Sequence, residues 1–226
     1  MKRFLLRLFI LSNFFVVSVY ALDARSYLVR YNEKMNQITT LSADLLVSSR
    51  MPGLTLADQK GKLRYVSPDK VDISGGLKDV IPPEVILINL HHVLMDSSVT
   101  ILPDVEMIAG GVAMNIYVED PSVGQLKWIV SMDTISWYIR DIFITDPPGN
   151  TVKIRFRQKK VQPDLFLPSS VEVEMISSDE NKQVPNPRKQ RIGLPNDEKS
   201  GTMSIRFSNY YINDPSLYEF FQKDVE

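Results

Sequence analysis

Apolar and polar residues alternate along the middle of the chain. Every second residue is apolar over 126–132 and again over 152–156. Such alternation, interrupted at 146–150 by Asp-Pro-Pro-Gly-Asn, predicts antiparallel strands joined by turns into a meander. In the intervening run, 137–145, the apolar positions change sides near Arg140 and Asp141, as a β-bulge would produce. A bulged strand of this kind helps a sheet to curve around apolar side chains.

The same reasoning assigns the rest of the chain. Apolar residues spaced by four and three predict a helix from Asp23, its candidate N-cap, to Ile38. Residues 105–112 fit either a short apolar helix or a mobile flap, and 215–221 a short amphipathic segment. Further strands are predicted at 41–47, 61–66, 71–74, 85–90, 99–102 (ended by Pro103), 113–119, 171–175 and 203–213.

These elements predict a mainly β protein of the α+β type, with about ten short strands in antiparallel order. A sheet of this length curls on itself. We therefore expect a strongly curved antiparallel sheet that forms an unclosed half-barrel. The N-terminal helix and short helices would cover its concave side, because an apolar sheet face must be buried against another layer.

The first 21 residues have the pattern of a cleavable signal peptide. A basic start at Lys2-Arg3 precedes an almost wholly apolar run over 4–19, and residues 19–21, Val-Tyr-Ala, end in the small-x-Ala form. The alternative is a retained membrane anchor, but the apolar run is short for a span, which needs about 20 residues. Residues 22–226 are then expected to be a single exported, soluble domain.

Charge and cysteine content narrow the function. Three of the 26 basic residues and none of the 27 acidic residues lie within 1–21, so the mature chain carries a net charge of −4. This mild acidity argues against nucleic-acid binding, which needs a clustered basic face. The chain has no cysteine, so it has neither a disulfide nor a cysteine for lipid attachment.

Residues 179–200 differ from the rest because they are rich in charge and proline. Such a segment cannot bury enough apolar surface to offset its loss of entropy on ordering. We expect a long mobile loop between the last two strands. It would be either a tolerated insertion, since long loops cost little stability, or a docking loop for a partner.

No motif for catalysis or metal binding is evident. His91 and His92 are the only histidines, and neighbours on a strand point to opposite faces, so they cannot easily share a metal. The serines lie in no G-x-S-x-G turn, and Gly75-Gly76 and Gly110-Gly111 lack the context of a phosphate loop. We therefore expect no enzyme activity, no cofactor and no metal.

The apolar side chains inside the predicted sheet are the remaining signal. They include Met107, Met114, Met132, Met175 and Met203, and flexible methionine suits surfaces that accommodate varied apolar ligands. The sheet could enclose an apolar cavity or a packed core. Composition alone favours the packed core, because most alternating strands simply bury one face.

Three stretches carry a family resemblance. The first runs from Tyr31 to Lys70 and contains N-x-I-x-x-L-x-A-x-L from Asn36 and G-x-L-x-Y-V-x-P-x-K from Gly61. The second runs from Ser131 to Phe156, and the third, which begins F-x-x-Y-x-I-N, runs from Phe207 to Phe221. Together they resemble the LolA/LolB-like periplasmic carriers and sorting proteins of outer-membrane lipoproteins. The resemblance implies an eleven-stranded half-barrel, closed by helices over a hydrophobic cavity that shelters lipoprotein acyl chains.

The resemblance also implies a monomer in the periplasm, an inner-membrane release complex and an outer-membrane acceptor as partners, and lipoprotein or other lipid acyl chains as ligand. A non-enzymatic envelope sensor or interaction module of the same fold is the alternative. Ser67 replaces an arginine that helps to latch the lid in many of these carriers. The residues expected to line the cavity are Leu28, Tyr31, Met35, Leu63, Tyr65, Met114, Ile116, Trp128, Val130, Met132, Ile154 and Phe156.

Overall fold

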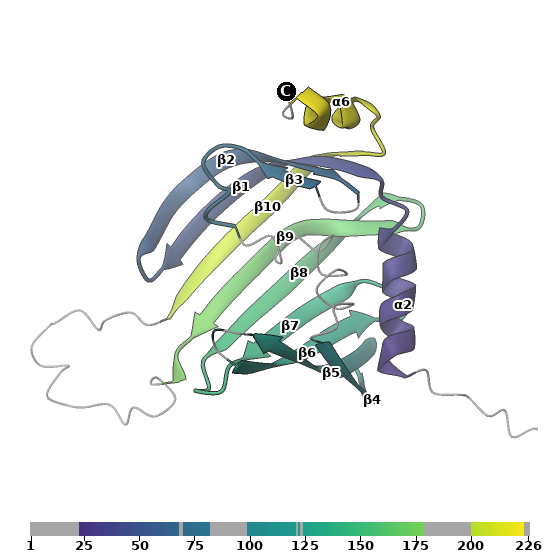
Figure 1. Cartoon of the computed structure of the whole chain (residues 1–226), viewed down its shortest axis with the longest axis vertical. Coiled ribbons are helices and arrows are strands. Elements are labelled where there is room, and N and C mark those ends of the chain that lie inside the picture. The colour runs from purple at the N-terminus through teal and green to yellow at the C-terminus, as the bar shows by residue number, and fades with distance from the viewer. Residues whose placement is uncertain are drawn as a thin grey trace, which may run out of the picture.

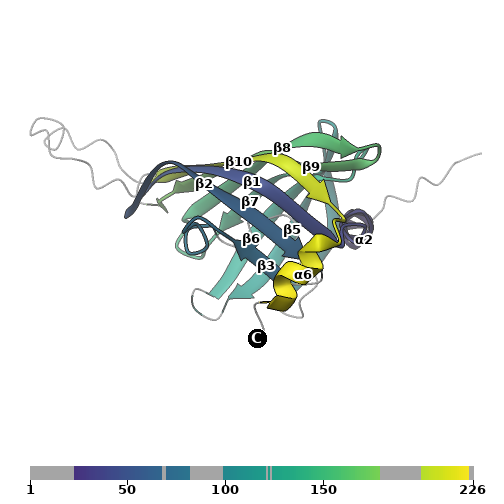
Figure 2. The same ribbon diagram turned by 90° about the horizontal axis from the view of Figure 1, so that it is seen from above.

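The computed structural model describes residues 23–67, 70–81, 99–120, 122, 124–178 and 200–223. Its strands form one antiparallel sheet of ten, in the order β3-β2-β1-β10-β9-β8-β7-β6-β5-β4. The sheet curves strongly, and its edge strands β3 and β4 do not pair with each other (Figures 1 and 2). The predicted fold class, a mainly β half-barrel that is not closed, is confirmed.

Two helices accompany the ten strands in the described part of the chain. Every pairing joins strands that are neighbours in sequence except the one between β1 and β10, the first and last strands along the chain. The elements are α2 (Ala24–Met35), β1 (Thr40–Met51), β2 (Leu54–Val66), β3 (Lys70–Ile73), β4 (Val99–Ile108), β5 (Gly111–Asp120), β6 (Gly124–Asp133), β7 (Ile139–Thr145), β8 (Thr151–Gln162), β9 (Leu165–Ile176), β10 (Gly201–Ile212) and α6 (Ser216–Lys223).

The register of the strands explains how alternation in the sequence becomes a buried surface. Residues directly opposite each other in an antiparallel pair share a face, and one such row crosses six strands from β5 to β10. All of its members are buried apolar residues: Met114, Val130, Ile142, Ile154, Val173 and Met203. Such rows form the apolar interior, which is the buried apolar cluster on the concave face of the sheet.

The predicted bulge lies in β7. Ser131 pairs with Asp141 but Met132 pairs with Ile139, which leaves Arg140 as the extra residue. Because of this bulge Ile139 and Ile142 are both buried, although an unbroken strand would place them on opposite faces. The strand starts at Ile139, so the first residues of the predicted run 137–145 belong to the preceding turn.

Two predictions around β4 were wrong. Pro103 does not end the strand, because β4 is an edge strand and its register with β5 shifts between Ile101 and Val105; a proline without an N–H is tolerated at such a place. Residues 105–112 form neither a helix nor a flap. They form the β4–β5 hairpin, whose turn needs the positive φ of Gly110 (+73°) and is fastened by Arg140 Nη1, 2.8 Å from the Ala109 carbonyl oxygen.

The two helices lie on different sides of the sheet. In Figure 1, α2 runs alongside the strand ends between β4 and the β8–β9 turn. In contrast, α6 packs against β1 and β2, where the Arg64 guanidinium lies 4.3 Å from the centre of the Phe220 ring. Arg64 alternates with buried Leu63 and Tyr65, so α6 covers the outer face.

Several predictions fall outside the described residues: the signal peptide at 1–21, the strand at 85–90, the pair His91-His92, and nearly all of the loop at 179–200. Within the described part of the chain, neither helix is long and apolar enough to cross a bilayer.

Candidate ligand-binding interior

The structure brings all twelve predicted cavity residues into the apolar interior. Each is between 0 and 6% exposed, and all belong to one contiguous cluster. The β5 and β6 members face each other directly, Met114 opposite Val130 and Ile116 opposite Trp128. Strand β7 lies between β6 and β8, and its Ile142 is opposite both Val130 on β6 and Ile154 on β8.

Helix α2 contributes one apolar face to this interior. Its buried residues, which recur every three or four positions, are Ala24, Tyr27, Leu28, Tyr31 and Met35. The helix starts at its predicted N-cap, because the Asp23 carboxylate accepts a hydrogen bond of 2.8 Å from the Ser26 backbone N–H. Hydrogen bonding by Ser26, first through its side chain and then through this backbone N–H, lowers the pKa of Asp23. Complete burial raises the pKa of the Tyr31 hydroxyl far above its ordinary value, so Tyr31 is neutral at physiological pH.

Contacts with two turns hold α2 over the strand ends. The Trp137 ring, in the β6–β7 turn, packs 5.9 Å from the Tyr27 ring, and the Arg30 guanidinium lies 4.7 Å from its centre. Lys34 Nζ reaches the backbone oxygen of Asp164 in the β8–β9 turn at 3.4 Å. Trp137 has a φ of +56°, which is uncommon for a bulky residue. The contacts of α2 with these two turns are made by side chains. They do not involve the backbone hydrogen bonds that join the strands of the sheet.

Asn213 fastens the segment that joins α2 to β1. Its Oδ1 accepts hydrogen bonds from the backbone N–H of Thr39 (2.8 Å) and from the Thr39 hydroxyl (3.1 Å). Its Nδ2 donates to the Gln37 backbone oxygen (3.0 Å), and its own N–H donates to the Thr40 oxygen (2.8 Å). Nothing in the sequence pattern predicts this, although Asn213 has the positive φ (+58°) that asparagine tolerates. We call these four bonds the Asn213 clamp.

The turn after β3 adds two residues that alternation could not identify. Leu77 and Ile81 are 0 and 1% exposed and belong to the apolar interior. Leu77 packs over Gly61 on β2, where an added Cβ would lie 2.6 Å from the Leu77 Cδ1. Gly61 therefore provides space for the Leu77 side chain to cover this part of the sheet.

Three buried polar atoms have no hydrogen-bond partner in the described part of the chain: Trp128 Nε1, Asn32 Oδ1 and Gln158 Oε1. A buried polar group without a partner is uncommon and costs about 1–3 kcal/mol. Trp128 is the only one of the three that belongs to the predicted cavity residues.

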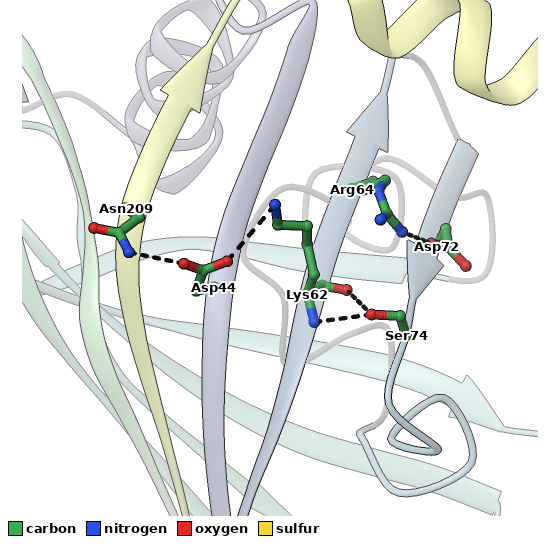
Figure 3. Close-up of polar contacts among 6 residues, drawn as sticks. All are labelled: Asp44, Lys62, Arg64, Asp72, Ser74 and Asn209. Atoms are coloured by element: carbon green, nitrogen blue, oxygen red, sulfur yellow. Dashed lines mark hydrogen bonds and ion pairs between the residues drawn. The ribbon is translucent and has the colours of Figure 1, made fainter.

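The outer face of the sheet carries a chain of polar contacts, drawn in Figure 3. Asp44 on β1 accepts a hydrogen bond from Asn209 Nδ2 (2.7 Å) and lies 3.8 Å from Lys62 Nζ. One strand further, Arg64 pairs with Asp72 at 2.7 Å. These side chains are all partly exposed to solvent, and ion pairs of this kind contribute little to stability. We therefore assign these contacts to the alignment of β10, β1, β2 and β3 and not to a catalytic role.

A groove of about 910 Å³ lies elsewhere, over β1, β2, β9 and β10. Most of its lining side chains alternate with buried positions and so belong to the outer face, among them Ser48, Arg50, Asp58, Glu172, Glu174 and Ser204. None of the twelve predicted residues lines this groove. Within the described residues, no group of three or more metal-binding side chains comes together.

Comparison with known proteins rests on structure alone, because no family model and no curated protein sequence matches the chain. A LolA superfamily protein from Nitrosomonas europaea aligns with 91% of this chain and 100% of its own, with a TM-score of 0.52 and 9% identity. The fold is LolA-like. A candidate outer membrane lipoprotein-sorting protein domain from Vibrio parahaemolyticus aligns with 88% of this chain and 97% of its own, at 9% identity and a TM-score of 0.47.

At this level of identity the comparison establishes the fold and not the ligand. The LolA-like fold agrees with the resemblance found in the sequence. In this structure α2 lies across the strand ends of an unclosed sheet, with its apolar face in the interior. Ser67, which replaces the expected lid arginine, is exposed, and its N–H donates to the Thr39 oxygen at 2.8 Å.

Proposed function

We propose that this protein is an exported carrier that shelters the acyl chains of lipoproteins, or of other lipids, in the periplasm. The observation that carries the proposal is the apolar interior of a LolA-like half-barrel, covered at the strand ends by a helix that is held through side-chain contacts to turns. An inner-membrane release complex and an outer-membrane acceptor would be its partners.

In the empty protein the interior is filled by its own side chains, so an acyl chain must replace contacts made by α2. Burying a hydrocarbon chain contributes about 0.8 kcal/mol per CH₂ group. A chain of about sixteen carbons would therefore bury an amount of hydrocarbon comparable with the apolar face of α2 that it displaces. Release would require an acceptor that binds the chain at least as well, since nothing else in the proposal supplies energy.

A cross-linking experiment tests whether α2 must move. The chain has no cysteine, so a double variant with Lys34→Cys and Asp164→Cys can be joined by a short bismaleimide, because Lys34 already reaches Asp164. We expect the cross-linked protein to lose binding of a fluorescent fatty-acyl probe. The same variant without cross-linker, and each single-cysteine variant treated with it, should bind normally. Unchanged binding by the cross-linked form would contradict the proposal.

The second candidate is an interaction module of the same fold that carries no lipid. The outer groove favours it, because this groove measures about 910 Å³, carries the charged side chains of Arg50, Glu172 and Glu174, and contains none of the twelve predicted cavity residues. A substitution in the groove, such as Glu174→Lys, should then abolish capture of a protein partner while the cross-link to α2 has no effect. In a carrier, Glu174→Lys should leave lipid binding unchanged, and the cross-link to α2 should abolish it.

A further inference from the structure

Trp128 holds a hydrogen-bond donor inside an otherwise hydrocarbon environment. The side chain is 6% exposed, and its Nε1 has no hydrogen-bond partner. A buried tryptophan N–H usually finds an acceptor. The other tryptophan of the chain, Trp137, lies in the β6–β7 turn against α2 and has no such unpartnered atom among the described residues.

The neighbours of Trp128 have no acceptor to offer. Across the sheet it faces Ile116 on β5 and Ile144 on β7. Along β6 the residues that share its face are Leu126 and Val130. All four side chains are hydrocarbon, and the neighbouring backbone carbonyls belong to the strand ladders. Among the described residues no acceptor reaches this N–H, so the site can take one from a bound ligand.

Trp128 also lies at a boundary within the interior. On the inner face of β6, Val130 and Met132 are completely buried, Trp128 is nearly so, Leu126 is half-buried, and Gly124 is exposed. Burial thus decreases from Met132 to the end of the strand at Gly124. A molecule that lies along this face would have its apolar end beside Met132 and its polar end near Gly124, with Trp128 at the transition.

We propose that Trp128 Nε1–H donates a hydrogen bond to the carbonyl oxygen of an ester or amide in a bound acyl lipid. The inference rests on the proposed function and specifies the ligand further. A plain hydrocarbon would leave the N–H unpaired. A charged carboxylate or phosphate would be costly at a site surrounded by hydrocarbon. A neutral carbonyl at the head of an acyl chain satisfies the donor and keeps the chain beside Val130 and Met132.

Two matched ligands test the proposal. Methyl hexadecanoate and octadecane have similar lengths, and only the first carries a carbonyl; the affinity of each is measured by displacement of a fluorescent apolar probe. We expect the natural protein to bind the ester about three- to tenfold more tightly than the alkane, the range of one neutral hydrogen bond. Trp128→Phe should remove this preference by weakening ester binding alone. Trp137→Phe changes a contact of α2 and should therefore alter the affinities for both ligands by the same factor, so that the preference for the ester remains.

Nuclear magnetic resonance supplies a readout that needs no change at Trp128. The chain has two tryptophans, so Trp137→Phe assigns the two indole N–H signals. The Trp128 signal should shift downfield with the ester and much less with the alkane. An ester preference that persists in Trp128→Phe, or a Trp128 signal that responds equally to both ligands, would overturn the inference alone. Failure of the natural protein to bind either ligand would overturn the proposed function as well.

Discussion

Ile154 and Ile135 are both isoleucines, but the first is buried (5% exposed) and the second is exposed (84%). Ile154→Ala should lower the free energy of unfolding by about 2–4 kcal/mol, because it removes buried hydrocarbon from a packed row. Ile135→Ala is the control and should change it by less than about 0.5 kcal/mol. Urea denaturation measures both values.

The same pair of variants also bears on function. If acyl chains enter the interior, Ile154→Ala should weaken binding of a fatty-acyl probe, since the side chain that packs in the empty protein would also contact the ligand. Ile135→Ala should bind as the natural protein does. A large loss of stability with unchanged binding would mean that Ile154 belongs to a core and not to a binding site.

Individual buried residues could be predicted wherever the alternation was regular. Ile154 and Val130 follow directly from it. Leu77 and Ile81 could not be found, because they lie in a turn and no periodic pattern marks them. The role of Asn213 could not be predicted for a related reason. It depends on hydrogen bonds to residues more than 170 positions earlier, and a local pattern carries no information on such a contact.

Among the elements, α2 depends most on side-chain contacts, and Arg30 against Trp137 is the one that can be removed most cleanly. Arg30→Gln removes the charge that lies over the Trp137 ring, an interaction of about 0.5–1 kcal/mol at an exposed site. We expect faster amide hydrogen exchange within 24–35 and little change elsewhere. Arg25→Gln, on the same helix but without a ring contact, is the matched control. Equal hydrogen exchange in both variants would show that the Arg30–Trp137 contact does not hold α2 in place.

The Asn213 clamp holds the other end of this helix. Asn213→Ala should lower the free energy of unfolding by about 0.5–1.5 kcal/mol, because the backbone N–H of Thr39 and the backbone oxygen of Gln37 lose their side-chain partner, and should speed hydrogen exchange at Thr39 and Thr40. Asn209→Ala is a suitable control, since Asn209 has a similar positive φ of +49° but bonds to Asp44 instead. If both variants behave alike, the effect comes from the backbone conformation and not from the clamp.

The types of most elements could be read from the sequence, and β4 shows why one could not. Its residues do not alternate cleanly, because an edge strand packs on one neighbour only and Pro103 interrupts the pattern. Gly110 forms the tight turn of the β4–β5 hairpin, and no alternation marks a turn at this position. The bulge in β7 was predictable, because it shifts the alternation itself.

At the scale of the whole molecule, the segment 179–199 connects β9 to β10 along the chain. The two strands pair up to Met175 opposite Gly201, and the Ser177 N–H reaches the Ser200 hydroxyl at 3.5 Å. The ends of the segment are therefore close together. A two-residue Asn-Gly turn is the connection that antiparallel strands most readily accept, so it can replace 179–199 without moving either strand.

We expect this replacement to leave the fold and acyl binding intact if the protein is a carrier, because no residue of the apolar interior is removed. Stability should rise by about 1–2 kcal/mol, since the entropy cost of closing a loop grows with the logarithm of its length. Urea denaturation and titration with the fatty-acyl probe measure the two effects. As a control, scrambling the sequence of 179–199 at constant length should leave both stability and acyl binding unchanged.

The alternative is an interaction module that docks its partner through this segment. In that case the shortened and the scrambled variant would both fold and would bind the acyl probe equally, but each would lose the partner. Loss of acyl binding in the shortened protein alone would show that the length of the segment contributes to the carrier, and would contradict the assignment of lipid binding to the apolar interior by itself.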